Sequence, residues 1–342
     1  MAKLIRIGMD TSKSVFQLHG VDGQGHPVLR RQLRRREVLK YFGALEPVTV
    51  AIEACGGAHY WARVLSALGH EVKLIAPQHA KRYVKRGKND AADAAALCEA
   101  VSRPDMQFVA AKSAEQQAGL MLAGLRSRLV RSRTQLTNAI RSYAAEFGLI
   151  TAKGLDKVEP LLARAVSDAE LPELARDLFA MHGREYARVQ AQLREVEVKL
   201  MAWHRGNECS RRLAEMPGVG PIGGTLLALK QVDARACRSG RHFAAWLGLT
   251  PRDHSTAGKT RLGRITRAGD PTLRSVLVVG AMAVIRQALH HPERASPWLL
   301  GLLRRKPKKL AAVALANKTA RIAWKLMTSG ERYQPGRTIL AA

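Results

Sequence analysis

Five short apolar runs near the start of the chain, and the way they are joined, limit its fold more than any other feature. They have strand length and lie at 4–10, 15–21, 27–33, 48–54 and 71–76. Tight turns join the first three runs, one of them with the sequence DGQG, and this predicts an antiparallel meander. Helices are expected near 36–45, 58–68 and 89–102. They alternate with the later runs and predict parallel crossovers onto the same sheet, in the order β-β-β-α-β-α-β-α.

The pattern changes after residue 113 to that of long amphipathic helices. Apolar residues in 113–147 are spaced by three, four and seven, and those in 184–204 follow a heptad seam. The stretch 150–180 between them is mixed and contains two prolines. We expect an antiparallel helical hairpin or coiled coil, used as an interdomain arm or for oligomerisation.

The last third of the chain is expected to be mainly helical. Apolar helices are predicted at 276–289 and 309–328, with the basic sequence RRKPKK beginning at residue 304 between them. The fold class is therefore a multidomain α/β plus α protein. We predict domain boundaries at 1–110, 111–206 and 207–342.

The charge of the chain indicates its partners. Among 342 residues, 56 Lys and Arg stand against 28 Asp and Glu, a net charge of +28, and the usual partner of such a chain is a nucleic-acid backbone. No apolar run reaches the roughly 18–20 residues of a membrane span. The four cysteines are widely scattered and include no CxxC pair. This spacing argues against both a zinc ribbon and a disulfide framework. With no signal peptide visible, we expect a cytoplasmic protein, associated with the nucleoid when bound to DNA.

Four acidic residues have the spacing of a metal site. Asp10 and Glu53 end predicted strands, while Asp90 and Asp93 share one face of a predicted helix. Carboxylates that converge at one sheet edge suit Mg²⁺ or Mn²⁺, and such ions support attack on a phosphodiester. Asp10 is also compatible with a turn cap, and the helical pair with acids favoured by the helix dipole. The joint pattern is more specific than any member.

Basic residues precede the helical acid pair and are expected to hold DNA or RNA beside it. They are Arg82, Lys85, Arg86 and Lys88. A separate candidate is the sequence MPGVGPIGG, in which Gly218 and Gly220 match the turn of a helix-hairpin-helix. Glycine backbone amides of such a turn can face a phosphate near a helix N-terminus. The alternative is a tight helix–helix turn without a ligand.

Taken together, the order of elements in 1–102 resembles the RNase H-like fold of RuvC-type nucleases. The four acids look like the DEDD quartet of one group of bacterial insertion-sequence transposases. The run FAAWLGLTPRDHSTAGKTRLGRITRAGDPTLRSVL, which begins at residue 243, resembles the second domain of the same group. The chain thus resembles insertion-sequence family one-ten and its one-one-one-one branch, a family of RNA-guided recombinases.

This resemblance implies a mechanism with two parts. The acids hold divalent metal on the scissile phosphate, and a serine of the C-terminal domain attacks it to form a covalent phosphoserine link to DNA. One register of the motif assigns this role to Ser255 and another to Thr256. We expect Ser255, because its primary hydroxyl is less hindered. Four basic residues nearby are expected to contact DNA, namely Arg252, Lys259, Arg261 and Arg264.

The resemblance also implies partners. They are donor and target DNA, a guide or bridge non-coding RNA that reads the bases, and further copies of the chain, as dimers that assemble into a tetramer. Two other hypotheses remain open from the residues. A RuvC-like structure-specific DNA nuclease using water needs the acids but not Ser255, and a non-catalytic nucleic-acid scaffold needs neither.

Overall fold

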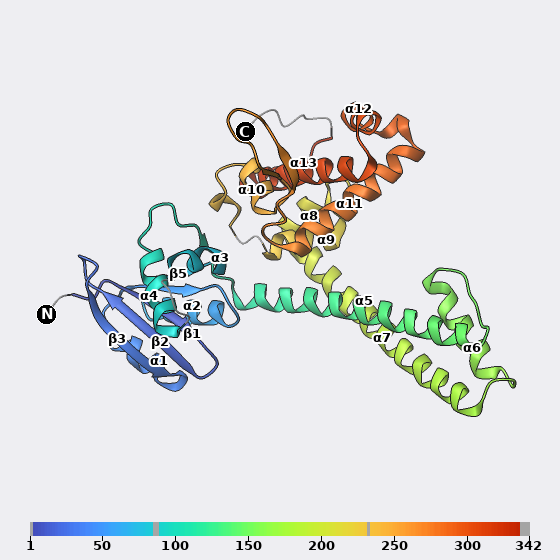
Figure 1. Ribbon diagram of the computed structural model, residues 1–342, viewed down its shortest axis with the longest axis horizontal. Coiled ribbons are helices and arrows are strands. Elements are labelled where there is room, and N and C mark those ends of the chain that lie inside the picture. Colours follow the sequence, from blue (N-terminus) through green and yellow to red (C-terminus); the bar gives the residue numbers. More distant parts are fainter. Residues whose placement is uncertain (1–2, 85–88, 231–232, 336–342) are drawn as a thin grey trace. The chain divides into compact units, whose positions relative to one another are not determined.

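The structure is a computed structural model that describes residues 3–84, 89–230 and 233–335. The chain divides into two compact units, Met1–Gln117 and Ala118–Ala342. Unit 1 contains a sheet flanked by helices, and unit 2 is mainly helical (Figure 1). The predicted combination of an N-terminal α/β part with a helical C-terminal region is confirmed. The division into three domains stays a prediction.

Unit 1 is built on a six-stranded sheet with the order β3-β2-β1-β4-β5-β6. The strands are β1 (Arg6–Thr11), β2 (Val15–Val21), β3 (Pro27–Arg34), β4 (Thr49–Glu53), β5 (Glu71–Ile75) and β6 (Phe108–Val109). The first three form the predicted antiparallel meander. Strand β4 pairs in parallel with both β1 and β5, as the crossovers predicted. The two-residue β6 was not predicted, because so short a strand leaves no periodic signal.

Helices cover both faces of this sheet. They are α1 (Val38–Gly43), α2 (Ala58–Ala67), α3 (Pro77–Ala80) and α4 (Asp90–Ala100). On one face, Met9 and Leu18 belong to the same core as Phe42 of α1 and Leu65 of α2. On the other face, Ala51 of β4 packs in a smaller core with residues of α3 and α4. The alternation of buried side chains along β1 and β4 thus fixes which residues face α4.

Helix α4 lies directly against the backbone of β1 at Gly8. A β-carbon added to Gly8 would lie 2.0 Å from the carbonyl oxygen of Ala94 and 2.6 Å from the amide nitrogen of Cys98. Real β-carbons do not approach backbone atoms so closely, so only glycine permits this contact. The consequence is that the first turn of α4 is held at the end of β1.

Unit 2 contains a pair of long helices joined through a short one (Figure 1). They are α5 (Ala114–Glu146), α6 (Val158–Ser167) and α7 (Glu173–Gly206). Leu129 of α5 packs with Val189, Leu193 and Val196 of α7, as the predicted helical hairpin requires. Helix α7 begins earlier than the predicted residue 184, and α6 was missed. The prolines at 160 and 172 fall in a first turn and at an N-cap, where proline is tolerated.

The remaining helices of unit 2 surround a second core. They are α8 (Glu208–Ala214), α9 (Gly220–Lys230), α10 (Gly240–Trp246), α11 (Pro271–His290), α12 (Pro297–Arg305) and α13 (Lys308–Ser329). A two-stranded sheet of β7 (Pro251–Asp253) and β8 (Leu262–Ile265) lies between α10 and α11 in sequence. Within the described ranges, α11 is the one helix whose length and apolarity match a membrane span. Its Leu273, Leu277 and Ile285 are buried in the core of unit 2.

We predict that Gly8→Ala loosens α4 and lowers the stability of unit 1. The added methyl group overlaps backbone atoms that cannot move alone, and overpacking of this kind costs about 1–3 kcal/mol. The urea midpoint of the full chain and hydrogen exchange of the α4 amides measure the two effects. Gly43→Ala is the control, because a β-carbon there meets no atom within 4 Å. Unchanged exchange in α4 of Gly8→Ala would show that the contact is not needed.

Candidate active site

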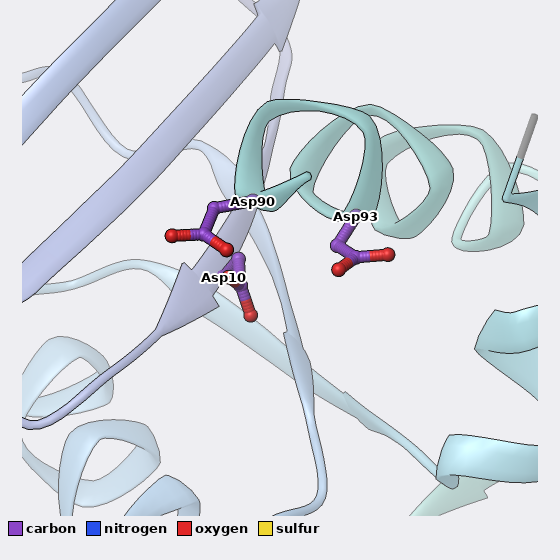
Figure 2. A group of neighbouring side chains, drawn as sticks. All are labelled: Asp10, Asp90 and Asp93. Carbon is purple, nitrogen blue, oxygen red and sulfur yellow. The ribbon is translucent and has the colours of Figure 1, made fainter. Parts of the chain in front are cut away.

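Three aspartates converge at the end of β1. Asp10 is the residue before the last in that strand, and Asp90 and Asp93 lie in the first turn of α4. One carboxylate oxygen from each lies within 4.8 Å of the others, and the three side chains point toward a common region (Figure 2). The structure therefore brings together three of the four acids that the sequence singled out.

Local structure explains why the helical pair is presented in this way. Asn89 is the N-cap of α4, and its side-chain oxygen accepts a hydrogen bond of 2.7 Å from the amide of Ala92. The cap begins the helix just before Asp90, so both aspartates occupy the first turn, where the helix dipole favours negative charge. The small residue Ala94, fully buried, lets the helix approach Gly8.

Glu53 lies on the neighbouring strand but outside this cluster. The parallel register pairs Met9 with Ile52, so Asp10 and Glu53 are the next residues of adjacent strands. Both lie on the face that α4 covers, because Gly8 pairs with Ala51. The carboxyl of Glu53 does not join the set of oxygens within 4.8 Å. Its charge nevertheless acts on the cluster, because it raises the pKa of Asp10.

Mutual repulsion and burial perturb two of these acids. Burial, followed by the charges of Asp90, Asp93 and Glu53, raises the pKa of Asp10 to about 6. Burial and then the charge of Asp93 raise the pKa of Glu53. Carboxylates that disfavour one another's ionisation are stabilised by a cation between them. An all-oxygen donor set fits a hard divalent ion such as Mg²⁺ or Mn²⁺.

The surroundings of the acid cluster are polar. The hydroxyl of Thr11, the last residue of β1, and the thiol of Cys55, just after β4, lie 3.3 Å apart and share a hydrogen bond. Of the four predicted basic contacts before α4, Arg82 is exposed beside α3. Lys85, Arg86 and Lys88 lie outside the described residues, so their prediction has no structural counterpart.

The second predicted site forms the tip of the β7–β8 hairpin. Thr256 and Lys259 face each other across the turn, with a 2.9 Å hydrogen bond from the Lys259 amide to the Thr256 carbonyl. The two residues between them, Ala257 and Gly258, have φ values of +47° and +78°. Two successive positive φ values are typical of a hairpin turn whose twist matches the flanking strands. The motif HSTAGK is therefore a hairpin tip.

Hydrogen bonds with Asp253, the last residue of β7, and Arg261, just before β8, hold Ser255. Its hydroxyl oxygen accepts a 2.9 Å hydrogen bond from the amide of Arg261. Its own amide donates a 2.8 Å hydrogen bond to the Asp253 carboxylate. Hydrogen bonds from the side chain and amide of Ser255 lower the pKa of Asp253, so that this carboxylate stays ionised. Thr256 instead closes the turn through its backbone.

The predicted basic residues around Ser255 lie on the same hairpin. Arg252, Lys259, Arg261 and Arg264 are all exposed. The root of the hairpin is tightly packed, since a β-carbon at Gly269 would lie 2.0 Å from the Trp246 carbonyl oxygen. The hairpin thus presents an exposed hydroxyl and several cations on a firmly anchored base.

The two glycines of the predicted helix-hairpin-helix have different surroundings. Gly218 lies in the turn between α8 and α9 and Gly220 is the first residue of α9, both with positive φ. A β-carbon at Gly218 would lie 2.6 Å from the carbonyl oxygen of Gly280 in α11, whereas one at Gly220 would meet no atom within 4 Å. Packing alone thus requires Gly218, and the predicted nucleic-acid contact of these two glycines stays a prediction.

Sequence reasoning missed several positioning residues. Gly8 and Asn89 contact neither metal nor substrate in the predicted mechanism. Asn89 nevertheless sets where α4 begins, and Gly8 sets how closely α4 packs against β1. Asn89 is the one with a visible signal, an N-cap residue directly before the acidic turn. The contact of Gly8 with α4 joins residues far apart in sequence and has no local signal.

Comparison with known proteins agrees with this geometry. Residues 210–295 match the model of the transposase IS116/IS110/IS902 family, and residues 7–147 match the DEDD transposase model of IS110. A putative transposase of Sinorhizobium fredii, y4pF/y4sB, is 64% identical over 97% of this chain and 86% of its own length. The transposase for insertion sequence element IS1111A of Coxiella burnetii is 37% identical over 96% and 91%, respectively.

Clustered acids at the end of a strand, in a chain with a net charge of +28, are typical of the class of DNA-processing enzymes. Within it, the chain belongs to the IS110/IS116/IS902 family of insertion-sequence transposases, with a DEDD-type domain. Members of such a family cut and rejoin DNA, so DNA is the substrate of this chain. The predicted transposase and its DNA partner are confirmed.

We predict that the metal-free protein loses stability as the pH rises from about 4 to above 6. Folded Asp10, with its pKa raised to about 6, binds a proton that the unfolded chain releases at lower pH, so ionisation opposes folding. The loss is about 1 kcal/mol, because Asp10 is half exposed and partly screened. Urea midpoints in EDTA, compared between the wild type and Asp10→Asn, measure it.

The same titration provides a test for the metal. Mg²⁺ should raise the urea midpoint of the wild type above pH 7 and have a smaller effect below pH 5, where Asp10 is protonated. Asp10→Asn should lose this dependence. A Mg²⁺ effect of equal size in the variant at both pH values would place the ion elsewhere.

Proposed function

We propose that this chain is an RNA-guided DNA recombinase that combines the acid cluster with a serine nucleophile. The observation that carries the proposal is the convergence of Asp10, Asp90 and Asp93 beside Glu53. The order of the first five strands, a meander followed by parallel crossovers, supports an RNase H-like domain of the RuvC type. The similarity to the IS1111A transposase supports a place in the one-one-one-one branch.

The four acids would hold a divalent metal, Mg²⁺ or Mn²⁺, at the end of β1. Such an ion neutralises charge on a phosphate and favours displacement at phosphorus. The carboxyl of Glu53 lies outside the cluster of three aspartate oxygens, but the charge of Asp93 helps to raise its pKa. We therefore assign Glu53 to the same metal centre. The role of the helix is positional, since α4 fixes two of the carboxylates against β1.

Ser255 is the proposed nucleophile. Its Oγ attacks the scissile phosphorus, the bond from phosphorus to the leaving sugar oxygen breaks, and a phosphoserine link forms. The serine proton is transferred to a base, and the departing sugar oxygen takes up a proton. Asp253 orients the hydroxyl through hydrogen bonds with Ser255. Reversal of the same step on another strand rejoins DNA without hydrolysis.

The proposed nucleic-acid contacts are the basic residues around both sites. Arg252, Lys259, Arg261 and Arg264 would bind DNA near Ser255. Arg82, with Lys85, Arg86 and Lys88 outside the described residues, would bind near the acids. Backbone contact of this kind carries no base sequence, so a bound guide or bridge RNA supplies the sequence readout.

Further copies of the chain are the remaining proposed partners. The paired helices α5 and α7 expose large apolar side chains, among them Tyr143 at 53%, Leu174 at 70% and Met181 at 56% exposed. Such residues favour association. We propose dimers that assemble into a tetramer, with the acids of one subunit meeting the serine of another. The reaction takes place in the cytoplasm, where bacterial DNA lies.

We predict that Ser255→Ala abolishes both recombination and the covalent protein–DNA adduct. Loss of the attacking oxygen removes the covalent step, so the rate should fall by about a thousandfold or more. Denaturing gels of the protein with labelled DNA detect the adduct. Thr256→Ala is the matched control on the same hairpin tip and should retain it. An adduct that persists in Ser255→Ala and vanishes in Thr256→Ala would move the nucleophile to Thr256.

Asp93→Asn separates the acids from the serine in the same assay. It should stop adduct formation and cleavage alike, because both need the metal centre. Cleavage that survives in Ser255→Ala but not in Asp93→Asn would instead favour a RuvC-like nuclease that uses water. Cleavage that survives in Asp93→Asn would exclude the metal-centre proposal.

We predict that the purified complex carries a discrete RNA and an even number of chains. Native mass spectrometry reads both, and sequencing identifies the RNA. Leu174→Glu should lower the number of chains, because a charge on the exposed apolar face opposes association. Its control is Glu173→Gln, one residue away, which leaves the apolar face intact. A heterogeneous mixture of cellular RNA would contradict guidance, and an unchanged assembly in Leu174→Glu would contradict association through α7.

A further inference from the structure

The register of the meander extends the face of the acid cluster across two further strands. Asp10 pairs with Gln17 of β2, and Gln17 pairs with Gln32 of β3. Residues that pair across a sheet have side chains on the same face. The three side chains therefore form a row that leads from the metal centre to the edge strand of the sheet.

A second row runs parallel to the first. Gly8, which contacts α4, pairs with His19, and His19 pairs with Arg30. Arg34 follows two residues after Gln32 and lies on the same face. Helix α4 lies over β1 and β2 on this face, whereas Arg30, Gln32 and Arg34 of β3 remain exposed. We name Gln17, Gln32, Arg30 and Arg34 the edge strip.

The chemistry of the edge strip is that of backbone recognition. Guanidinium and amide side chains are common donors to phosphate and sugar oxygens. Within the described part of the chain, neither Arg30 nor Arg34 has an acidic ion-pair partner. Burial and then the charge of Arg30 lower the pKa of His19, so His19 does not add to this charge near neutral pH. The two arginines remain available to an external anion.

The opposite face of the same strand has a different environment. Leu33 is buried in the core, and the Arg31 guanidinium lies 4.9 Å from the centre of the Tyr41 ring of α1. Arg31 thus has an internal contact that its neighbour Arg30 lacks. The two adjacent arginines of β3 therefore differ in role. Arg31 contacts another side chain of the protein, whereas Arg30 is open to an external ligand.

We propose that the edge strip holds the phosphate backbone of the DNA strand that continues from the scissile phosphate. This inference rests on the proposed function, because it takes the acids of β1 and α4 as the place of cleavage. Gln32 lies two strand spacings from Asp10, about 10 Å, so a DNA strand can reach it within a few nucleotides of the scissile phosphate. The contact is to the backbone and would therefore be independent of base sequence.

Photocrosslinking with a local probe tests this inference. p-Benzoylphenylalanine is placed at position 32 or at position 31 of the full chain. Each protein is purified with its RNA and irradiated together with labelled single-stranded DNA of mixed sequence. Both proteins carry Asp93→Asn, so that crosslinking is read without cleavage. We expect at least about fivefold more DNA adduct from position 32, which faces the strip, than from position 31. Equal yields, or adducts to the bound RNA in place of DNA, would overturn the assignment.

Salt dependence of binding provides the second measurement. Arg30→Ala should lower the slope of log Kd against log salt for the same DNA by about 0.7, the value for one lost phosphate contact on a single strand. Arg31→Ala removes the same charge and should leave the slope unchanged. Melting temperatures of both variants check that they are folded. Equal slope changes would mean that only net charge matters and would refute the strip.

These results are distinguishable from a failure of the proposed function. Crosslinking and salt slopes report binding, whereas the acids are tested by loss of cleavage in Asp93→Asn. Should cleavage survive that substitution while position 32 still crosslinks DNA, the edge strip would stand as a DNA contact and the metal centre would not.

Discussion

The contact between Gly8 and helix α4 is the constraint on which the candidate metal centre depends. Without a β-carbon at residue 8, the helix backbone rests directly on β1, and its first turn meets the end of that strand. Two aspartates from a distant segment then lie beside Asp10. Their mutual repulsion opposes folding in the absence of a cation, and close packing of buried alanines against the strand offsets it. The site is thus strained by charge and stabilised by packing.

The two halves of the proposed chemistry use opposite structural solutions. Asp10 and Glu53 are partly buried at the ends of strands in unit 1, so that burial and neighbouring charges raise their pKa values. Ser255 instead lies on an exposed hairpin tip, where hydrogen bonds with Asp253 and Arg261 hold it in place. Exposure suits a group that has to reach a phosphate held elsewhere. The packed glycines at the hairpin root supply the rigidity that its tip lacks.

Much of the fold followed from the sequence because its signals are local. The five predicted strands, the long helix beginning near residue 113 and helix α13 all occur close to their predicted bounds, whereas α11 begins five residues before the predicted 276. Helix α6 was missed because it is short and Pro160 lies in its first turn. The start of α7 was missed because its first turns precede the predicted heptad seam, which begins at Val189. The four acids were identified from their positions at element ends. Their proximity was inferred from the topology of the sheet. The carboxylate oxygens of Asp10, Asp90 and Asp93 do lie close together, whereas that of Glu53 lies outside this cluster.

The sequence by itself determined which residues carry charge and which segments form strands and helices, because periodicity and composition act within a few neighbouring residues. It also contained the motif that tied the chain to a transposase family. Only the tertiary structure decided that Gly8 lets α4 rest on β1, that Asp253 and Arg261 hold Ser255, and that Gln32 lies in a row with Asp10. These relations depend on strand register and on close packing between segments distant in sequence. Both are set by the whole fold, and neither leaves a local pattern in the chain.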